Sequence, residues 1–223
     1  MINIYPSLIS ADLMNLEKEI KLLEPYCTGF HIDVMDNHFV PNLTWGKMFI
    51  DAIGKITKKP LWVHLMIDNP SIFIDTLVLS PESILTFHIE SASDVKKLSR
   101  RIKEKNIIPS IAVSPKTPVE KIFPFLDLVD HILIMTVEPG FSGQCFLQSS
   151  KSKIEKLFSH VNISKLKVSD LRIKISVDGG VGRENIGELA KIGVSDFAVG
   201  SGIFDYKNRV EAIKKLYELA KKI

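Results

Sequence analysis

The chain has 223 residues, of which 45% are hydrophobic and 25% are charged, and its formal net charge is +3. These values are typical of a globular protein, and they exclude intrinsically disordered, collagen-like and disulfide-scaffold chains. The small charge and the absence of any Lys/Arg tract longer than a pair argue against nucleic acid as a partner.

Short apolar runs alternate along the chain with segments that carry apolar residues at helical spacing. We predict strands at 2–7, 30–35, 61–66, 84–89, 107–113, 132–137, 172–177 and 196–199. Eight runs in 223 residues average about 28 residues per unit, close to the roughly 30 residues of a β-α-β step.

Amphipathic helices are predicted between these runs. The first apolar stripe is formed by Leu13, Leu16, Ile20 and Leu23, with Asp12 as its expected cap. Further stripes lie at 95–102, 154–161 and 210–220. A single apolar face of this kind is typical of a helix that covers a sheet.

Apolar strands that alternate with one-sided helices indicate a parallel sheet covered on its outside. Eight such units predict an α/β fold, a closed (β/α)8 TIM barrel in which residues 1–223 form a single domain. The alternative is a doubly wound open sheet. That fold usually carries a glycine-rich turn after its first strand, and residues 7–13 contain no glycine.

Polar side chains lie near the carboxyl ends of three predicted strands, where a TIM barrel carries its functional groups. His31 and Asp33 are two residues apart on one strand and share a face, and His64 and Asp178 occupy similar places on two others. Two imidazoles and two carboxylates can bind a divalent cation such as Zn, Mn, Fe or Co. The alternative is that the histidines are hydrogen-bonded core residues and the aspartates cap helices.

Glycines form a second group after the late strands, in segments 139–143, 178–182 and 200–202. A phosphate needs converging backbone N–H groups and room for close approach, and barrels often provide both in the loops after strands seven and eight. Glycines also serve simply to turn a strand into a helix. The pattern nevertheless favours a TIM barrel of the phosphate-binding type, with a metal at one side of its mouth and a phosphate at the other.

The location of the protein is indicated only indirectly. The two cysteines, Cys27 and Cys145, give no disulfide framework and fit a reducing compartment, so we expect a cytoplasmic protein. Residues 1–15 lack the basic and apolar regions of a signal peptide. No apolar run approaches the roughly 18 residues of a membrane span, and we expect no membrane association.

Several motifs, in order and at barrel spacing, resemble the ribulose-phosphate 3-epimerase family over nearly the whole chain. The matching segments are 6–12, 31–42, 64–67, 135–144, 177–180 and 199–204. The resemblance implies one divalent cation per chain and inversion at C3 of D-ribulose 5-phosphate to give D-xylulose 5-phosphate, a step of the pentose phosphate pathway. It implies His31, Asp33, His64 and Asp178 as metal ligands, with Asp33 and Asp178 as the two acid/base groups.

The resemblance also implies a set of substrate contacts around these ligands. The set comprises Ser7, Met35, His64, Met66, Met135, Gly140, Ser142, Gly143, Gly179, Gly180, Gly200 and Ser201. Ordinary barrel filling explains the methionines nearly as well. We expect a phosphorylated ketose as the small-molecule partner and a homo-oligomeric enzyme.

The sequence departs from the family pattern at four positions. Trp62 stands where the family usually has Asp, and Asn37 stands where it usually has Gly. Ser142 and Gly202 replace a usual Gly and Ala. These changes leave the four ligands intact and bear on substrate preference rather than on chemistry.

Three other functions stay open at this point. A 3-epimerase of a related ketose phosphate, such as allulose 6-phosphate, would share the same motifs. A decarboxylase or aldolase on the same barrel generally needs a lysine at a strand end, whereas Lys174 lies early in its strand. A sugar-phosphate-binding barrel without catalysis would not need both aspartates.

Overall fold

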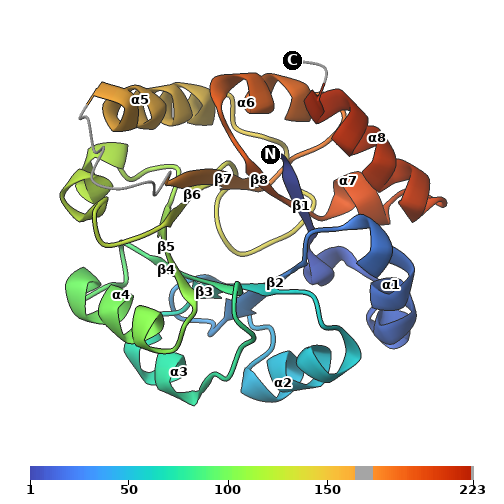
Figure 1. Cartoon of the computed structure of the whole chain (residues 1–223), viewed down its shortest axis with the longest axis horizontal. Coiled ribbons are helices and arrows are strands. Elements are labelled where there is room, and N and C mark those ends of the chain that lie inside the picture. Colours follow the sequence, from blue (N-terminus) through green and yellow to red (C-terminus); the bar gives the residue numbers. More distant parts are fainter. Residues whose placement is uncertain (164–172, 222–223) are drawn as a thin grey trace.

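Eight parallel strands form one sheet within the described part of the chain, which comprises residues 1–163 and 173–221 of this computed structural model. Neighbouring strands follow the order β1-β8-β7-β6-β5-β4-β3-β2. A parallel bridge between Ser7, directly after β1, and His31 of β2 closes the sheet into a barrel (Figure 1). The predicted TIM barrel is confirmed.

Each predicted strand is present, and only the ends differ from the prediction. The strands are β1 Asn3–Pro6, β2 Phe30–Met35, β3 Leu61–Met66, β4 Ile84–His88, β5 Ile108–Val113, β6 His131–Met135, β7 Lys174–Asp178 and β8 Asp196–Val199. Arg172, the predicted start of the seventh strand, lies outside the described residues, and β7 extends one residue further than predicted, to Asp178.

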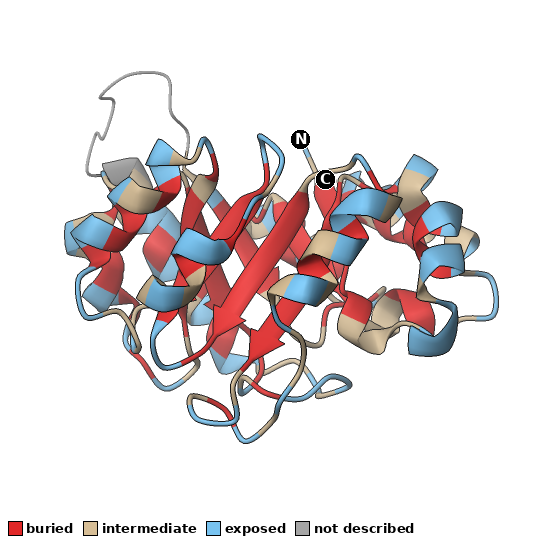
Figure 2. Cartoon of the chain, turned by 90° about the horizontal axis from the view of Figure 1, so that it is seen from below, coloured by how far each residue is buried: buried red, intermediate tan, exposed pale blue. Residues whose placement is uncertain are grey.

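The α-helices surround the strands and expose their outer faces (Figure 2). They are α1 Leu16–Leu23, α2 Lys47–Ile56, α3 Pro70–Thr76, α4 Val95–Glu104, α5 Ser149–Ile163, α6 Ile186–Ile192, α7 Ser201–Phe204 and α8 Arg209–Lys221. Short 3-10 segments are η1 Leu8–Ser10, η2 Leu13–Asn15, η3 Glu24–Tyr26 and η4 Val119–Phe125. Within the described ranges, no helix combines the length and the apolar character needed to cross a membrane.

The first helix begins later than its apolar pattern predicts. The predicted stripe started at Leu13, but this residue lies in η2 with 48% of its surface exposed, so its assignment to the buried face is wrong. Asp12 caps η2 rather than α1, because its carboxylate accepts a hydrogen bond from the backbone N–H of Met14. This local bond holds a tight turn ahead of the helix.

Between β5 and β6 the crossover is the 3-10 segment η4 in place of an α-helix. Pro124 lies inside this segment and has no backbone N–H, so an α-helical hydrogen bond to the preceding turn cannot form there. Val119 and Ile122 are nonetheless buried. The segment therefore covers the sheet as a helix would.

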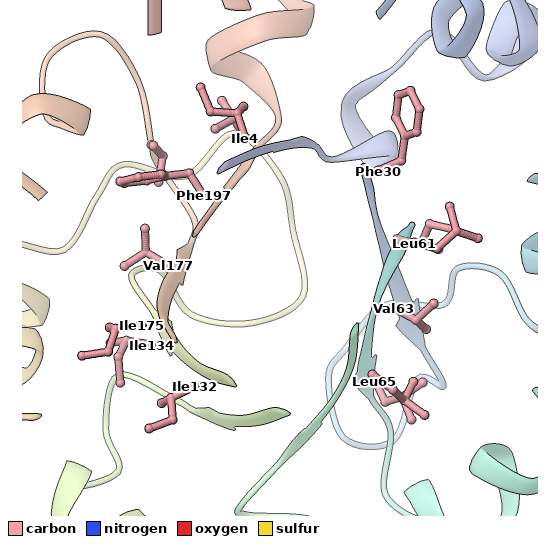
Figure 3. Close-up of a cluster of buried hydrophobic side chains, with 14 of the residues drawn as sticks. Ile4, Phe30, Leu61, Val63, Leu65, Ile132, Ile134, Ile175, Val177 and Phe197 are labelled. Atoms are coloured by element: carbon pink, nitrogen blue, oxygen red, sulfur yellow. The ribbon is translucent and has the colours of Figure 1, made fainter. Parts of the chain in front are cut away.

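Alternation along the strands divides the buried side chains into two layers. Leu61, Val63 and Leu65 of β3 point outward into the large cluster between strands and helices (Figure 3). Trp62 on the same strand points into the barrel and packs in a smaller cluster with Tyr5. Side chains consequently fill the barrel toward the amino ends of its strands, and its open space lies at their carboxyl ends.

We predict that Phe197→Ala strongly destabilises the protein. Phe197 of β8 is fully buried in the outer layer, and removing its ring leaves a cavity that costs about 3–5 kcal/mol of unfolding free energy. Urea unfolding followed by circular dichroism measures the loss. Met48→Ala is the control, because Met48 is 88% exposed and its truncation should change stability by less than about 0.5 kcal/mol. Equal losses in the two variants would contradict the two-layer core.

Candidate active site

A cavity opens at the carboxyl ends of the strands, between the strand tips and the loops that follow β6, β7 and β8. It is lined by eleven of the twelve predicted substrate contacts, namely Ser7, Met35, Met66, Met135, Gly140, Ser142, Gly143, Gly179, Gly180, Gly200 and Ser201. The twelfth, His64, is fully buried beneath it. Ser10 and Gln144 also line the cavity; both lie in segments that match the family, but neither was predicted as a substrate contact.

The two histidines and two aspartates predicted as metal ligands come together at the floor of this cavity. One possible ligand atom from each of His31, Asp33, His64 and Asp178 lies within 4.8 Å of the corresponding atoms of the others. His64 Nδ1 lies 3.1 Å from Asp33 Oδ1 and 3.4 Å from Asp178 Oδ2. These residues therefore form one cluster rather than separate core contacts or helix caps.

The orientation of His31 follows from its neighbour Ser7. The Ser7 hydroxyl donates to Asp33 Oδ2 at 3.0 Å, so its oxygen is free to accept the hydrogen of His31 Nδ1, also at 3.0 Å. His31 Nε2 then carries a lone pair. It is buried without a hydrogen-bond partner among the described residues and lies 3.8 Å from Asp178 Oδ2. An unpaired buried nitrogen beside a carboxylate fits a metal ligand.

The electrostatics of the cluster favour positive charge. Burial by itself raises the pKa of Asp33, but the charges and hydrogen bonds of His31 and His64 outweigh it and hold that pKa well below its ordinary value. Burial also opposes charge on His64, yet its hydrogen bonds with Asp178 and Asp33 raise its pKa to about 9. Asp33 is thus ionised at neutral pH and stabilises positive charge beside it.

The rim of the cavity after β7 is built from glycines whose backbone few other residues can adopt. Gly180 has a φ of +62°, and a Cβ built there would lie 2.4 Å from the backbone N of Phe146. Gly179 has a φ of +111° and would place a Cβ 2.3 Å from Val137 Cγ2. In the described part of the chain, no lysine or arginine lines the cavity. An anion at this rim would depend on backbone N–H groups.

Two of the departures from the family pattern have a clear structural basis. Asn37 has a φ of +57°, the left-handed conformation that Asn tolerates better than most residues. Trp62 is fully buried below the cluster, with its ring centroid 4.9 Å from that of His31 in an edge-to-face contact. Its Nε1 donates to Thr86 Oγ1 at 2.8 Å, so the indole is satisfied within the barrel. Trp62 does not line the cavity.

Sequence analysis assigned no role to His88 and Glu90, which lie behind His64. His88 Nε2 is 2.9 Å from His64 Nε2, and Glu90 Oε2 is 3.1 Å from His88 Nδ1. The signal that could have found them is the spacing His-x-Glu at the end of a strand, which parallels His31-x-Asp33 on β2.

Fold and site together define a TIM-barrel protein whose functional groups gather at the carboxyl ends of its strands. Residues 3–204 match the model of the ribulose-phosphate 3 epimerase family. The chain is 36% identical to the ribulose-phosphate 3-epimerase of Bacillus subtilis, with 97% of this chain and 98% of that protein covered. It is 37% identical to that of Methanocaldococcus jannaschii, with 99% and 92% covered. The chain belongs to the ribulose-phosphate 3-epimerase family, a family of isomerases.

Solved structures with the same fold are more distant in sequence. A structure of KGPDC from Streptococcus mutans has a TM-score of 0.70 at 12% identity, covering 100% of this chain and 98% of that one. 3-Hexulose-6-phosphate synthase has a TM-score of 0.67 at 14% identity, covering 98% and 99%. At these identities the likeness concerns the barrel alone.

Proposed function

We propose that this protein is a metal-dependent ribulose-phosphate 3-epimerase that interconverts D-ribulose 5-phosphate and D-xylulose 5-phosphate. One observation carries the proposal. Asp33 and Asp178, from strands β2 and β7, line the same cavity and meet His31 and His64 at its floor. Family membership supports the same reaction.

The two carboxylates are suited to move a proton across the plane of the substrate. Epimerisation removes the hydrogen from C3, beside the C2 ketone, and returns a proton to the opposite face. Asp33 and Asp178 come from strands separated by β1 and β8 in the barrel, so they approach the substrate from different sides. One would accept the proton as carboxylate while the other donates one as carboxylic acid. In the reverse reaction their roles exchange.

The cluster also fits a divalent cation, which His31 Nε2, His64 Nδ1 and the two carboxylates would hold. A cation bound there would supply Lewis-acid stabilisation of the charge that develops on the ketone oxygen. Imidazole and carboxylate donors suit Zn, Mn, Fe or Co. Ser7 holds His31 and Asp33 in place, and the methionines that line the cavity would surround C3 with polarizable sulfur.

The glycine rim would bind the phosphate of the substrate through backbone N–H groups. Gly179 and Gly180 directly follow Asp178, so the rim and the reaction centre share one stretch of chain. Trp62 does not line the cavity, so this departure from the family pattern does not reshape its wall. A five-carbon ketose phosphate remains the substrate that we favour.

We propose that residues 1–223 act as one catalytic domain. Support comes from the outer core, which continues without a break from Ile4 of β1 to Ala220 of α8. A homo-oligomeric state and a cytoplasmic location stay predictions from the sequence.

We predict that each chain binds one divalent cation at this cluster. His64→Ala removes a ligand and should lower metal occupancy at least about tenfold, whereas His160→Ala on α5, outside the barrel, should leave it unchanged. Metal content after dialysis against Zn or Mn, measured by mass spectrometry, checks this. Chelation should abolish epimerisation in parallel. Full activity at negligible metal content would contradict metal dependence.

We predict that Asp178→Asn separates proton exchange from inversion. The wild type should interconvert the two pentulose phosphates, and the variant should lose about 10²–10⁴-fold in that rate. Asp33 can still remove and return the C3 proton on its own face. In deuterated water the variant should therefore incorporate deuterium at C3 and form little epimer. Epimerisation at the wild-type rate by the metal-loaded variant would show that Asp178 is not an acid/base group.

We predict that Gly180→Ala weakens phosphate binding. The added Cβ would meet Phe146 at 2.4 Å and shift the backbone N–H groups of the rim. Loss of one hydrogen bond to a charged group costs about 1.5–3 kcal/mol, so KM should rise about 10–100-fold. Gly54→Ala is the control, because a Cβ at Gly54 of α2 meets nothing within 4 Å. An unchanged KM in Gly180→Ala would contradict the phosphate assignment.

A further inference from the structure

A line of polar side chains leads from the candidate metal cluster into the barrel wall. His64 Nδ1 faces the two aspartates, while its other nitrogen, Nε2, lies 2.9 Å from Nε2 of His88 on the neighbouring strand β4. The other nitrogen of His88, Nδ1, lies 3.1 Å from Oε2 of Glu90. Both imidazoles are fully buried, so water does not satisfy these nitrogens.

Glu90 is itself held from the far side. Its second oxygen, Oε1, accepts the backbone N–H of Ser114 at 2.9 Å. The loop that carries Ser114 is anchored by Lys153 of α5, whose Nζ donates to the carbonyl oxygens of Ser114, Pro115 and Thr117 at 2.7–2.8 Å. The carboxylate is therefore fixed in the orientation that meets His88.

The direction of the hydrogen bonds follows from the end of the line. A carboxylate only accepts, so the hydrogen of a neutral His88 lies on Nδ1 and its Nε2 carries a lone pair. The two Nε2 atoms face each other at 2.9 Å, and one must donate while the other accepts. His64 then carries a hydrogen on Nε2. In the neutral imidazole that a cation requires, its Nδ1, between Asp33 and Asp178, is left with a lone pair.

We propose that Glu90 and His88 are positioning residues that fix the tautomer and ring orientation of His64, so that His64 Nδ1 is free to bind the cation. The inference rests on the metal site of the proposed function. A hydrogen-bonded partner on the outer nitrogen commonly orients a metal-binding imidazole, and its loss typically costs about 10–100-fold in metal affinity. Here the carboxylate acts through a second imidazole.

The isosteric variant Glu90→Gln tests the direction of the line. The amide oxygen of Gln keeps the hydrogen bond from Ser114 N–H, which leaves the NH₂ group facing His88 Nδ1. His88 then accepts at Nδ1, where the Ser114 hydroxyl at 3.3 Å can also donate, and it donates from Nε2. His64 is driven to the opposite tautomer, with a hydrogen on the Nδ1 that the cation needs.

The experiment measures Co²⁺ binding to the full chain and the tautomer of His64. Isothermal titration should give a dissociation constant about 10–100-fold weaker for Glu90→Gln than for wild type. Imidazole ¹⁵N NMR of the metal-free protein should show a hydrogen on Nε2 of His64 in wild type and none on Nε2 in the variant. Glu24→Gln is the matched control, because Glu24 likewise accepts from a backbone N–H, that of Lys58, at a distant position.

A second pair of variants, at His88, distinguishes a loss of positioning from a general loss of folding. His88→Gln retains an acceptor near the position of Nε2 and should bind Co²⁺ within about threefold of wild type, whereas His88→Leu should lose about 10–100-fold. Equal affinities in Glu90→Gln and Glu24→Gln, or an Nε2–H tautomer of His64 in Glu90→Gln, would overturn the inference. Failure of the wild type to bind Co²⁺ would instead overturn the metal site itself, and with it this role.

Discussion

The carboxylate of Asp33 is the constraint on which the mouth of this barrel depends. It is 4% exposed, and a charge so far from water must be paired. Its partners come from three adjacent strands: Ser7 directly after β1, His31 on β2 and His64 on β3. The Ser7–His31 bridge also closes the barrel between β1 and β2. Pairing this charge and closing the sheet are therefore achieved by the same residues.

Asp178 connects the histidine cluster at the floor of the cavity with the glycine rim. Its side chain reaches the histidines, while its backbone continues directly into Gly179 and Gly180. Its carbonyl oxygen accepts both the N–H and the hydroxyl hydrogen of Thr136 on the loop after β6, at 2.8 and 2.9 Å. The glycine rim is thus tied to the carboxylate at a fixed span. A ligand that uses both ends of the cavity must match that span, which makes its length part of recognition.

The sequence predicted the barrel and the four-residue cluster because both follow from short periodicities. Alternation places His31 and Asp33 on one face, and parallel strands bring all carboxyl ends to one mouth. The partnership of His64 with His88 depends on which residues of β3 and β4 lie opposite each other, and single-strand patterns do not contain that register. The prediction that the first helix starts at Leu13 was wrong for a local reason. Its apolar spacing fits a helix, but the turn capped by Asp12 takes this residue instead.

Trp62 has a consequence for how this site can be observed. The chain contains two tryptophans. Trp45 is half-buried and stacks on Phe49, whereas Trp62 is sealed from solvent with its ring against His31. Indole fluorescence is sensitive to the charge of a ring in contact with it. Once Trp45 is replaced by Phe, the remaining emission reports from directly beneath the histidines, and the protein carries its own optical probe of what they bind.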